Sequence, residues 1–230
     1  MPAKAKGLSP ETFRFFRDLA RNNNTPWMEA NRARYKASIV EPFRELLDEL
    51  APAVTKLDGE ILITGRSGDN FSRINRDIRF AKDKTPYRAQ MYALFRTRQA
   101  YETGGSNLYV GAAADGATAG FRAYVEGKES ALKKVGRPRG AENGAWVARQ
   151  KKRLGRKYES YWYSNVKKDW RKHSGWPVKP EEWKLLEAWI VRRKFSAAAA
   201  ARPNFITEVA AVFRDVFSIY QFAGSLKWKP

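Results

Sequence analysis

The sequence predicts an α+β fold in which an antiparallel sheet of about five strands carries helices on one face, with N-terminal and C-terminal helices flanking it. Three observations predict this class: helical patterns come first, short strand-like segments separated by glycines occupy the middle, and a long amphipathic helix comes last. With 230 residues, the chain is long enough for a substantial core and short enough for one domain. We therefore expect a flexible tail over residues 1–8 and a single α+β domain over residues 9–230.

Capping signals mark the N-terminal helices. Ser9 followed by Pro10 predicts a helix start, because a serine hydroxyl caps free backbone N–H groups and proline suits the first helical turn. The asparagine run 22–24 predicts the end of this helix, since asparagine competes for backbone hydrogen bonds and tolerates a left-handed backbone. A second helix is expected from Thr25, and a third, amphipathic one after Ser38.

Short apolar segments bounded by turn residues predict the sheet. We expect strands at residues 61–64, 71–74, 91–98, 107–112 and 119–125. The pair Asp115-Gly116 between the last two predicts a tight hairpin, because both residues tolerate the positive φ of a type I′ turn. Strands joined by turns this short pair antiparallel.

Helical patterns return beyond this hairpin. The expected elements are helices at 129–135, 145–161 and 183–189, a returning strand at 190–195, and a final helix that begins at Pro203. The final helix has the clearest amphipathic pattern in the chain, with a stripe formed by Val209, Val212, Phe213, Val216 and Phe217. Such a stripe predicts a helix that faces the core.

Composition excludes several kinds of site. Cysteine is absent, which excludes disulfides, a thiol nucleophile and cysteine-ligated zinc or iron–sulfur clusters. His173 is the single histidine, and its basic surroundings predict a solvated surface position rather than a general base. The glycines match neither a dinucleotide-binding pattern nor a P-loop. We predict no cofactor and no metal site.

Charge and hydropathy limit the partners. Lys+Arg 44 minus Asp+Glu 24 gives a net charge of +20, which attracts nucleic acid, anionic lipid headgroups or acidic small molecules. The same charge is also typical of a protein that is basic for solubility alone. No apolar run approaches the roughly 20 residues of a membrane span, and the N-terminus lacks the apolar segment of a signal peptide. We expect no membrane span and a cytoplasmic location.

The most unusual stretch runs from residue 73 to residue 88 and is called the basic segment here. Six basic and two acidic residues give it a net charge of +4, and it shows neither strand alternation nor a helical stripe. Its apolar residues predict anchors that hold an ordered loop while the cationic heads gather at one place; they are Ile74, Ile78, Phe80 and Tyr87. Concentrated cations require anionic partners.

Those partners are either internal or external. Asp77 and Asp83 would form an internal ion-pair network, but two acids cannot neutralise six bases. The surplus favours a phosphate or carboxylate from outside, for which arginine offers a planar fork and lysine a point charge. Direct contacts are expected from Arg76, Arg79 and Lys82, with the two acids as orienting groups. The whole predicted binding set is Arg73, Asn75, Arg76, Asp77, Arg79, Lys82, Asp83, Lys84, Tyr87 and Arg88.

Two other functions stay open. An enzyme would use Asp77 or Asp83, although neighbouring cations should lower the pKa of both carboxyls and suit a base better than an acid. A nucleic-acid-binding protein would use residues 147–172, where ten bases and two acids give a net charge of +8 and aromatic residues interleave. Its phosphate contacts would be Arg149, Lys151, Lys152, Arg153, Arg156 and Lys157. The other interpretation of this region is a helix with buried aromatic residues and solvated charges.

Several motifs resemble a known family. They are the N-terminal pattern Phe13…Leu19…Asn23-Asn24…Trp27…Tyr35, the string Arg-Asp-Ile-Arg-Phe-Ala-Lys-Asp-Lys-Thr-Pro-Tyr at 76–87, the hairpin at 107–127 and the final helix at 205–222. Together they resemble the family catalogued as domain of unknown function 2461. The resemblance implies the α+β fold and the importance of the basic segment, and it names no activity. The chain departs from the family at 170–177, which reads Trp-Arg-Lys-His-Ser-Gly-Trp-Pro where family members carry a Gly-Tyr-Asp…Asp-His-Pro-like segment.

Overall fold

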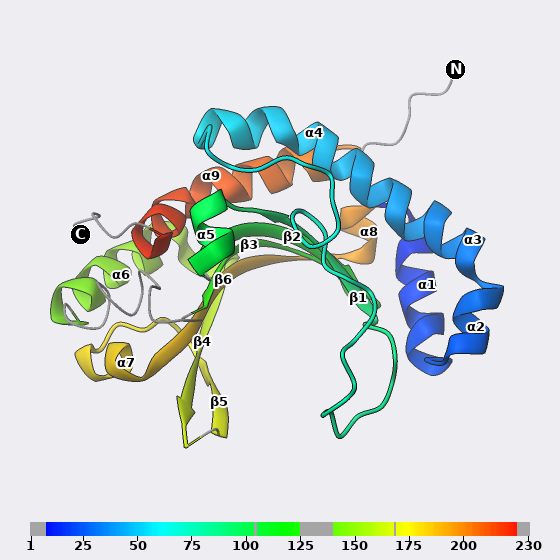
Figure 1. Cartoon of the computed structure of the whole chain (residues 1–230). Helices are drawn as coiled ribbons and strands as arrows, with labels where there is room; N and C mark the ends of the chain where they lie inside the picture. Colours follow the sequence, from blue (N-terminus) through cyan, green and yellow to red (C-terminus); the bar gives the residue numbers. More distant parts are fainter. Residues whose placement is uncertain (1–7, 104, 125–139, 168, 225–230) are drawn as a thin grey trace. The chain divides into compact units, whose positions relative to one another are not determined.

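The described chain forms an antiparallel sheet with helices, as the sequence predicts (Figure 1). The computed structural model describes residues 8–103, 105–124, 140–167 and 169–224. Its strands are β1 (Gln90–Phe95), β2 (Ser106–Ala113), β3 (Gly116–Tyr124), β4 (Glu159–Val166), β5 (Asp169–Ser174) and β6 (Leu186–Ser196). These six strands pair in the order β1-β2-β3-β6-β4-β5, so the described sheet has one strand more than the five or so expected.

Two compact units make up the chain. Unit 1 comprises Met1–Phe95, Val110–Thr118 and Lys194–Ala210. Unit 2 comprises Arg96–Tyr109, Ala119–Arg193 and Ala211–Pro230. Three strands, β2, β3 and β6, each contribute residues to both units. The single domain expected over residues 9–230 stays a prediction.

Unit 1 begins with helices whose ends follow the capping signals. Its helices are α1 (Pro10–Arg21), α2 (Thr25–Ala30), α3 (Arg32–Tyr35), α4 (Glu41–Leu57) and α8 (Ala197–Ala200), with a π-helical turn at Lys36–Val40. The Ser9 hydroxyl caps α1 by accepting a hydrogen bond from the Thr12 N–H at 3.3 Å. Asn24, rather than Thr25, caps α2, because its side chain accepts from the Trp27 N–H at 2.9 Å.

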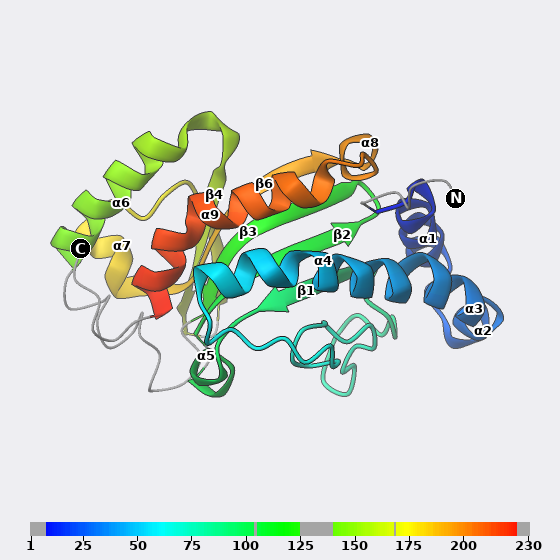
Figure 2. The same cartoon turned by 90° about the horizontal axis from the view of Figure 1, so that it is seen from above.

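The core of unit 1 is formed by apolar helix faces and β1. Phe13 and Phe16 of α1 are fully buried. The helix α4 lies over β1 (Figure 2), and its buried stripe consists of Phe43, Leu46, Leu47, Leu50 and Val54. Leu8, which we expected in the tail, is also buried, and its N–H donates to the Ala200 carbonyl at 3.0 Å. An apolar side chain next to a helix start thus joins the core.

Unit 2 is built around aromatic side chains. Its helices are α5 (Arg98–Thr103), α6 (Gly140–Leu154), α7 (Pro180–Leu185) and residues 211–224 of α9 (Phe205–Gly224), with a 3-10 turn at Gly155–Lys157. Trp183 and Trp189 are fully buried, and their rings meet edge-on at 5.9 Å. Phe222 of α9 packs edge-on against both rings. Aromatic contacts of this kind therefore join α7, β6 and α9.

The hairpin of β4 and β5 corrects the helix expected over residues 145–161. The helix α6 ends at Leu154, and β4 pairs with β5 in a register that places Tyr163 opposite Lys172. The buried side chains of β4 are Ser160, Trp162 and Ser164. Because two of these inward-facing residues are small and polar, the strand lacks the hydropathy alternation by which a half-buried strand is recognised.

The strands expected at 61–64 and 71–74 are also wrong. Residues between α4 and β1 form isolated bridges only, among them one that joins Phe71 to Ala93. The side chain of Asn70 takes the place of strand pairing, because it is buried and binds the backbone directly. Its amide makes hydrogen bonds of 2.7–3.0 Å with backbone groups of Leu62, Thr64, Gly65 and Leu94.

Other boundaries differ by a few residues. The strand β1 ends at Phe95, three residues earlier than expected, because α5 follows it. The strand β6 begins at Leu186, within the helix expected at 183–189. The final helix begins two residues later than expected, at Phe205, and it buries most of the expected stripe. The helix expected at 129–135 lies outside the described residues.

Candidate anion-binding site

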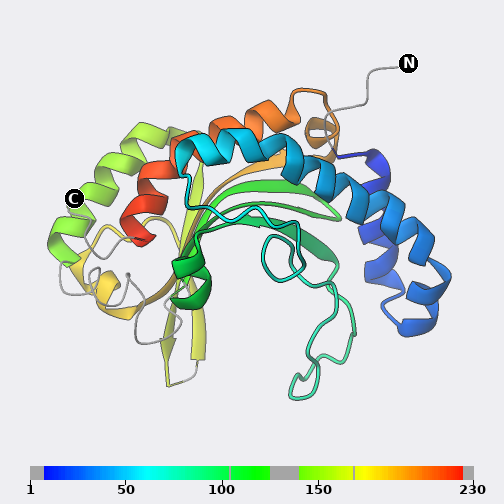
Figure 3. The same cartoon turned by 45° about the horizontal axis from the view of Figure 1, so that its top comes forward.

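The basic segment folds as a long, irregular hairpin between α4 and β1. The Arg76 N–H donates to the Pro86 carbonyl and the Arg88 N–H to the Ile74 carbonyl, both at 2.8 Å. An antiparallel bridge at Asn75 lies between these two bonds. The segment loops away from β1 (Figure 3). Its two arms therefore hold each other by backbone hydrogen bonds without joining the sheet.

Tyr87 anchors the basic segment, whereas Phe80 does not. The Tyr87 side chain is buried, and the Asn23 side chain holds its backbone at both the N–H and the carbonyl. Phe80 is 95 % exposed, so our expectation that it serves as an anchor is wrong. The hairpin tip carries this ring away from the core that receives Tyr87.

Both acids pair with arginines of the same hairpin. The Arg76 guanidinium donates to Asp83 at 2.5 Å and to the Thr85 carbonyl at 3.1 Å. The Arg79 guanidinium makes a two-pronged pair with Asp77, with bonds of 3.0 and 2.7 Å. Both carboxylates are exposed, so these pairs add little to stability. They nevertheless occupy two of the cations that we expected to contact a ligand.

Hydrogen bonds lower the pKa of both carboxyls. The Thr85 N–H, followed by Arg76 and the Thr85 hydroxyl, lowers the pKa of Asp83 to about 2. The pKa of Asp77 is lowered by the side chain and then the N–H of Arg79. Such carboxylates stay ionised at neutral pH and do not serve as general acids. An enzyme that used either group would have to use it as a base.

The remaining cations of the segment do not gather at one place. Lys84 donates to two backbone carbonyls of the hairpin tip at 3.0 and 3.4 Å. Lys82, Arg73 and Arg88 are exposed, and none of them has a hydrogen-bond or ion-pair partner within the described chain. The predicted binding set is therefore divided, because Arg73 and Asn75 lie at the base of the hairpin and line a cavity.

This cavity has a volume of about 380 Å³ and is called the arginine cavity here. It lies within unit 1, where α3 and α4 meet the loop after α4 and the start of the basic segment. Its polar lining consists of Arg32, Arg44, Arg73, Tyr35, Ser67, Ser72 and Asn75, and its apolar lining of Val40, Gly65, Phe71, Ile74 and Met91. No acid is among these lining residues. The cavity thus offers cations and neutral polar groups beside an apolar wall.

The π-helical turn brings Arg32 and Arg44 to the same cavity. The two residues are twelve positions apart on a helical stretch that continues from α3 into α4. In a regular α-helix, a separation of twelve residues leaves two side chains about 120° apart around the axis. The π-helical turn at Lys36–Val40 accommodates one extra residue, which reduces this difference to about 20°.

The three cavity arginines are only partly neutralised by the protein. Arg32 donates to Glu29 at 2.7 Å in an exposed pair. The Nη1 atom of Arg44 lies 3.5 Å from the Oε1 atom of Glu41, and this distance is longer than that of an ordinary N–H···O hydrogen bond. Arg73 has no such partner in the described chain. Because exposed ion pairs are weak, an incoming anion can compete for these guanidinium groups.

Neutral donors complete the polar lining. The ring of Tyr35 packs against Phe15 with centroids 5.7 Å apart, and burial raises the pKa of Tyr35, so its hydroxyl stays protonated. The Ser72 oxygen accepts a hydrogen bond from the Tyr92 N–H at 3.0 Å. This bond fixes the serine and leaves its own hydroxyl proton available to a ligand.

Of the residues that line the arginine cavity, the sequence predicted Arg73 and Asn75 as ligand contacts and did not single out Arg32 or Arg44. Arg32 and Arg44 each follow a glutamate by three residues. That spacing is typical of ion pairs on an exposed helix surface, so the sequence around them shows nothing unusual. The π-helical turn that aligns them also interrupts the regular helical period. Helical periodicity in the sequence therefore does not place the two arginines on one face.

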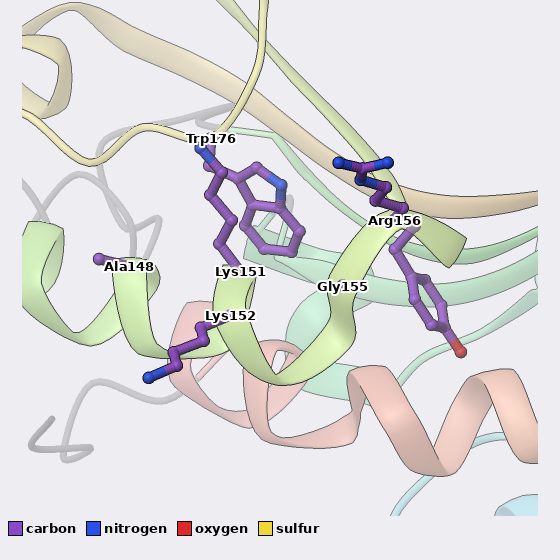
Figure 4. Close-up of a pocket in the computed structure, with 7 residues that line it drawn as sticks. Ala148, Lys151, Lys152, Gly155, Arg156 and Trp176 are labelled. Carbon is purple, nitrogen blue, oxygen red and sulfur yellow. The ribbon is translucent and has the colours of Figure 1, made fainter.

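The second basic region, residues 147–172, does not form one surface. Three of its six predicted phosphate contacts line a cavity in unit 2 (Figure 4), namely Lys151, Lys152 and Arg156. Arg149 and Lys157 are exposed and lie outside that lining. Arg153 instead donates to the Asp215 carbonyl at 2.6 Å. The expected row of phosphate contacts is therefore split among three different environments.

The aromatic residues of this region are likewise divided. Tyr158 and Trp162 are buried, as one of the two interpretations expects, whereas Trp170 is exposed. His173, expected at a solvated surface position, is half-buried. Its ring stacks on Trp162 at 4.0 Å, and its Nε2 lies 2.8 Å from the Ser164 hydroxyl oxygen. This histidine therefore belongs to the packing of the β4–β5 hairpin.

Two further properties bear on the class of protein. No helix in the described ranges is long and apolar enough to span a membrane. In the same part of the chain, no group of three or more histidine, aspartate or glutamate side chains is placed to hold a metal ion.

Comparison with known proteins identifies a family. A search of the curated proteins finds no match to the chain. A family model with the description "Conserved hypothetical protein (DUF2461)" matches residues 11–222. This range contains the N-terminal pattern, the basic segment, the hairpin and nearly all of the final helix, which are the parts on which the resemblance rests. The chain therefore belongs to the DUF2461 family of conserved hypothetical proteins.

Proposed function

We propose that this protein binds a small ligand bearing a phosphate or carboxylate group in the arginine cavity of unit 1. One observation carries the proposal. Three arginines from two separate parts of the chain, Arg32, Arg44 and Arg73, line one cavity whose lining contains no acid. Guanidinium groups brought together repel one another, and an anion that bridges them relieves this repulsion.

The lining favours an anion with an apolar part. A volume of about 380 Å³ lies within the range of small-molecule sites, which spans about 300–1,000 Å³. The arginines supply planar forks for the phosphate or carboxylate. Phe71, Ile74 and Met91 supply an apolar wall for the rest of the ligand. Tyr35 and Ser72 add neutral donors that fix its orientation.

The walls of the cavity are held in place before a ligand arrives. Asn70 fastens the loop after α4 to β1 through its buried amide. The Ser72 N–H donates to the Tyr92 carbonyl at 3.0 Å, which holds the chain just before Arg73. A preformed wall lowers the cost of ordering the site on binding. Exposed cations of the hairpin tip, such as Lys82, would attract anions toward the cavity.

The proposal is tested by titrating phenyl phosphate and inorganic phosphate against the whole protein by isothermal titration calorimetry. We expect phenyl phosphate to bind more tightly, because it also uses the apolar wall. Arg73→Gln is expected to weaken its affinity at least fivefold. Arg88→Gln is the matched control, since it removes the same charge from the same segment outside the lining. Equal weakening by both variants, or no binding by the unmodified protein, would contradict the proposal.

A second candidate function is binding of single-stranded nucleic acid on the β4–β5 hairpin. The register places Tyr161, Tyr163, Trp170 and Lys172 on one face of this strand pair. Trp170 is 54 % exposed, and its ring lies 6.2 Å from that of Tyr163. The Lys172 ammonium lies 4.1 Å from the centre of the Tyr161 ring. Exposed aromatic rings beside cations are typical of surfaces that stack bases and contact phosphates.

This second candidate is tested with a fluorescently labelled oligothymidylate and a salt series. Affinity should fall steeply as salt rises, with a slope that reports several phosphate contacts. Trp170→Ala leaves the charge unchanged and should weaken the binding free energy of the oligonucleotide by about 1–3 kcal/mol, the contribution of one stacked base. Leu185→Ala is a control at an exposed apolar residue of α7 and should have no effect. No binding at low salt would exclude this function.

A further inference from the structure

The cavity at the C-terminal end of α6 is separate from the arginine cavity. It has a volume of about 470 Å³ and is called the indole cavity here. All of its lining residues belong to unit 2: Ala148, Lys151, Lys152, Gly155, Arg156, Tyr158 and Trp176. Three are cationic and none is acidic. Its walls are otherwise apolar or aromatic.

An indole donor without a hydrogen-bond partner in the described chain lies in the wall of this cavity. Trp176 is only 8 % exposed, yet its Nε1–H makes no hydrogen bond within the described chain. The two neighbouring tryptophans do have acceptors: Trp183 donates to the Pro177 carbonyl and Trp189 to the Ser160 hydroxyl, both at 2.9 Å. Figure 4 shows the indole nitrogen of Trp176 on the side of the ring that faces Arg156.

Although most of the Trp176 ring is buried, solvent reaches its indole nitrogen. Tryptophan N–H groups at largely buried rings usually find an acceptor, so this donor is available to a ligand. The Trp176 ring is held in position by an edge-on contact with Trp189 at 6.1 Å. The donor therefore has a fixed direction, and a ligand acceptor that enters the cavity would satisfy it.

The charged groups around this donor are free to act on the same ligand. Lys151 runs alongside the Trp176 ring, whereas Lys152 points to the other side of α6 (Figure 4). Lys151 and Arg156 are exposed and have no ion-pair partner within the part of the chain that the structure describes. An anion that accepts from the indole would thus lie between a lysine and an arginine.

Local backbone geometry builds the other wall. Gly155 ends α6 with φ of +62°, in the left-handed region that glycine adopts without strain. The chain then turns so that Arg156 and Tyr158 line the cavity that α6 borders. The Tyr158 hydroxyl donates to Asp215 at 2.6 Å. Its proton is therefore used elsewhere, and the residue contributes mainly its ring.

These features define the class of ligand. The cavity offers hydrogen-bond donors and cations, whereas its lining side chains include no carboxylate, amide or other strong acceptor. A nucleobase presents donors as well as acceptors and would leave its donors unpaired here. A carboxylate or phosphate monoester presents acceptors only. Its apolar body would lie against Ala148, Gly155 and Tyr158.

We propose that the indole cavity binds a small aromatic or aliphatic carboxylate or phosphate monoester, whose oxygen accepts from Trp176 Nε1–H between Lys151 and Arg156. This proposal does not depend on the anion site of unit 1, because the two cavities share no residue. It assigns the cationic residues of α6 to a single small ligand rather than to a nucleic-acid backbone.

Nuclear magnetic resonance of ¹⁵N-labelled protein tests the proposal directly. The probes are 2-naphthoate and 2-naphthyl phosphate, with neutral 2-naphthamide as the matched analogue of the same shape. Trp176→Phe identifies the Trp176 indole signal by its loss. We expect both anions to shift this signal in a saturable manner, and 2-naphthamide to bind at least tenfold more weakly.

Variants separate the site from general charge. Arg156→Gln and Lys151→Gln should each weaken 2-naphthoate binding at least fivefold, whereas Arg149→Gln and Lys157→Gln remove the same charge outside the lining and should change it less than twofold. Trp176→Phe keeps the apolar packing and should weaken binding about tenfold. If this variant fails to fold, the surface variants and the neutral analogue decide. Equal affinity for the amide, unchanged affinity in Arg156→Gln, or no shift of the Trp176 signal would overturn the proposal.

Discussion

The side chain of Asn23 makes with Tyr87 both of the hydrogen bonds that a neighbouring strand would make. Its Nδ2 donates to the Tyr87 carbonyl at 2.8 Å, and its Oδ1 accepts from the Tyr87 N–H at 3.0 Å. The amide group thereby fastens the basic segment to the turn between α1 and α2, within unit 1. Both residues belong to the motifs that resemble the family.

Asn23→Ala should loosen the basic segment. The substitution leaves the Tyr87 N–H and carbonyl without their partners, and we expect the free energy of unfolding to fall by about 1–3 kcal/mol. Amide hydrogen exchange should become faster over residues 74–88. Asn204→Ala is the control, because the Asn204 side chain donates to the half-buried Glu208 side chain in a solvent-exposed hydrogen bond. Unchanged exchange in Asn23→Ala would show that the segment is held by Tyr87 packing alone.

Gly116→Ala should destabilise the β2–β3 hairpin. Gly116 has φ of +147°, and a Cβ added there would lie 2.3 Å from the Phe195 carbonyl oxygen. Both the backbone conformation and the close approach of β6 exclude a side chain, so we expect a loss of at least about 1 kcal/mol of unfolding free energy. Gly59→Ala is the matched control, since an added Cβ there meets nothing within 4 Å. Equal melting temperatures for the two variants would contradict this account.

Local signals were sufficient for much of the fold. Ser9 and the asparagine run predicted α1 because capping depends on a few neighbouring residues. The Asp115-Gly116 pair predicted the hairpin of β2 and β3, although the two turn positions are Ala114 and Asp115. The long apolar stripe of α9 predicted a buried helix, because its repeat lies within that one helix. Each signal is contained within a single element and needs no knowledge of distant contacts.

Elements that depend on distant partners were not predictable. The strand β4 buries Ser160, whose hydroxyl accepts from Trp189 of β6, and so a polar residue faces the core. The loop after α4 lacks a strand because the Asn70 side chain occupies backbone groups that pairing would use. In both cases a polar side chain also binds a group distant in the sequence: Trp189 lies 29 residues from Ser160, and the Leu94 carbonyl lies 24 residues from Asn70. Hydropathy patterns report only whether a residue is apolar.

In the candidate site, too, some features have a local sequence signal and others depend on the three-dimensional structure. The charge surplus of the basic segment singled out Arg73 and Asn75, which line the arginine cavity, but it also predicted that all cations of the segment gather in one cluster. The structure pairs Arg79 with Asp77, two residues away, and distributes the rest. Arg32 and Arg44 join the cavity only through the π-helical turn, and a turn of this kind has no signature in composition.

The pKa of Asp83 gives a prediction for acid pH. Because this pKa is lowered to about 2 in the folded chain, the carboxylate contributes stability above the ordinary aspartate pKa of about 3.9. That contribution is lost as pH falls through the window between these values. Titration of the Asp83 side-chain ¹³C signal should give a midpoint near 2.

Arg76→Gln separates the causes of this lowered pKa. The Thr85 N–H is the first cause and stays in place, so the midpoint should rise and yet remain below the ordinary value. The midpoint of Asp77, which is paired with Arg79, should not move. A midpoint of Asp83 that is unchanged in Arg76→Gln would show that the 2.5 Å contact between the two side chains does not persist in solution.

Tyr158→Phe should remove a source of alkaline sensitivity. Burial, and then the hydrogen bond to Asp215, raises the pKa of Tyr158 well above its ordinary value. The folded state therefore favours the protonated phenol, and its stabilising effect is complete below about pH 10, the ordinary tyrosine pKa. Above that pH the effect is lost, because the phenol ionises in the unfolded chain while it stays protonated in the folded one.

The free energies of unfolding of the unmodified protein and Tyr158→Phe should differ by an amount that depends on pH. At neutral pH, Tyr158→Phe should lower the free energy of unfolding by about 1 kcal/mol, since it removes one hydrogen bond to a carboxylate that water can reach. From pH 9 to pH 11 this difference should shrink, because the unmodified protein loses the stabilisation that its protonated Tyr158 phenol provides and the variant lacks this phenol at every pH. Tyr101→Phe, at an exposed tyrosine, should show no such trend. Urea unfolding at each pH measures the difference, and a value that stays constant across this range would mean that Tyr158 ionises equally readily in both states.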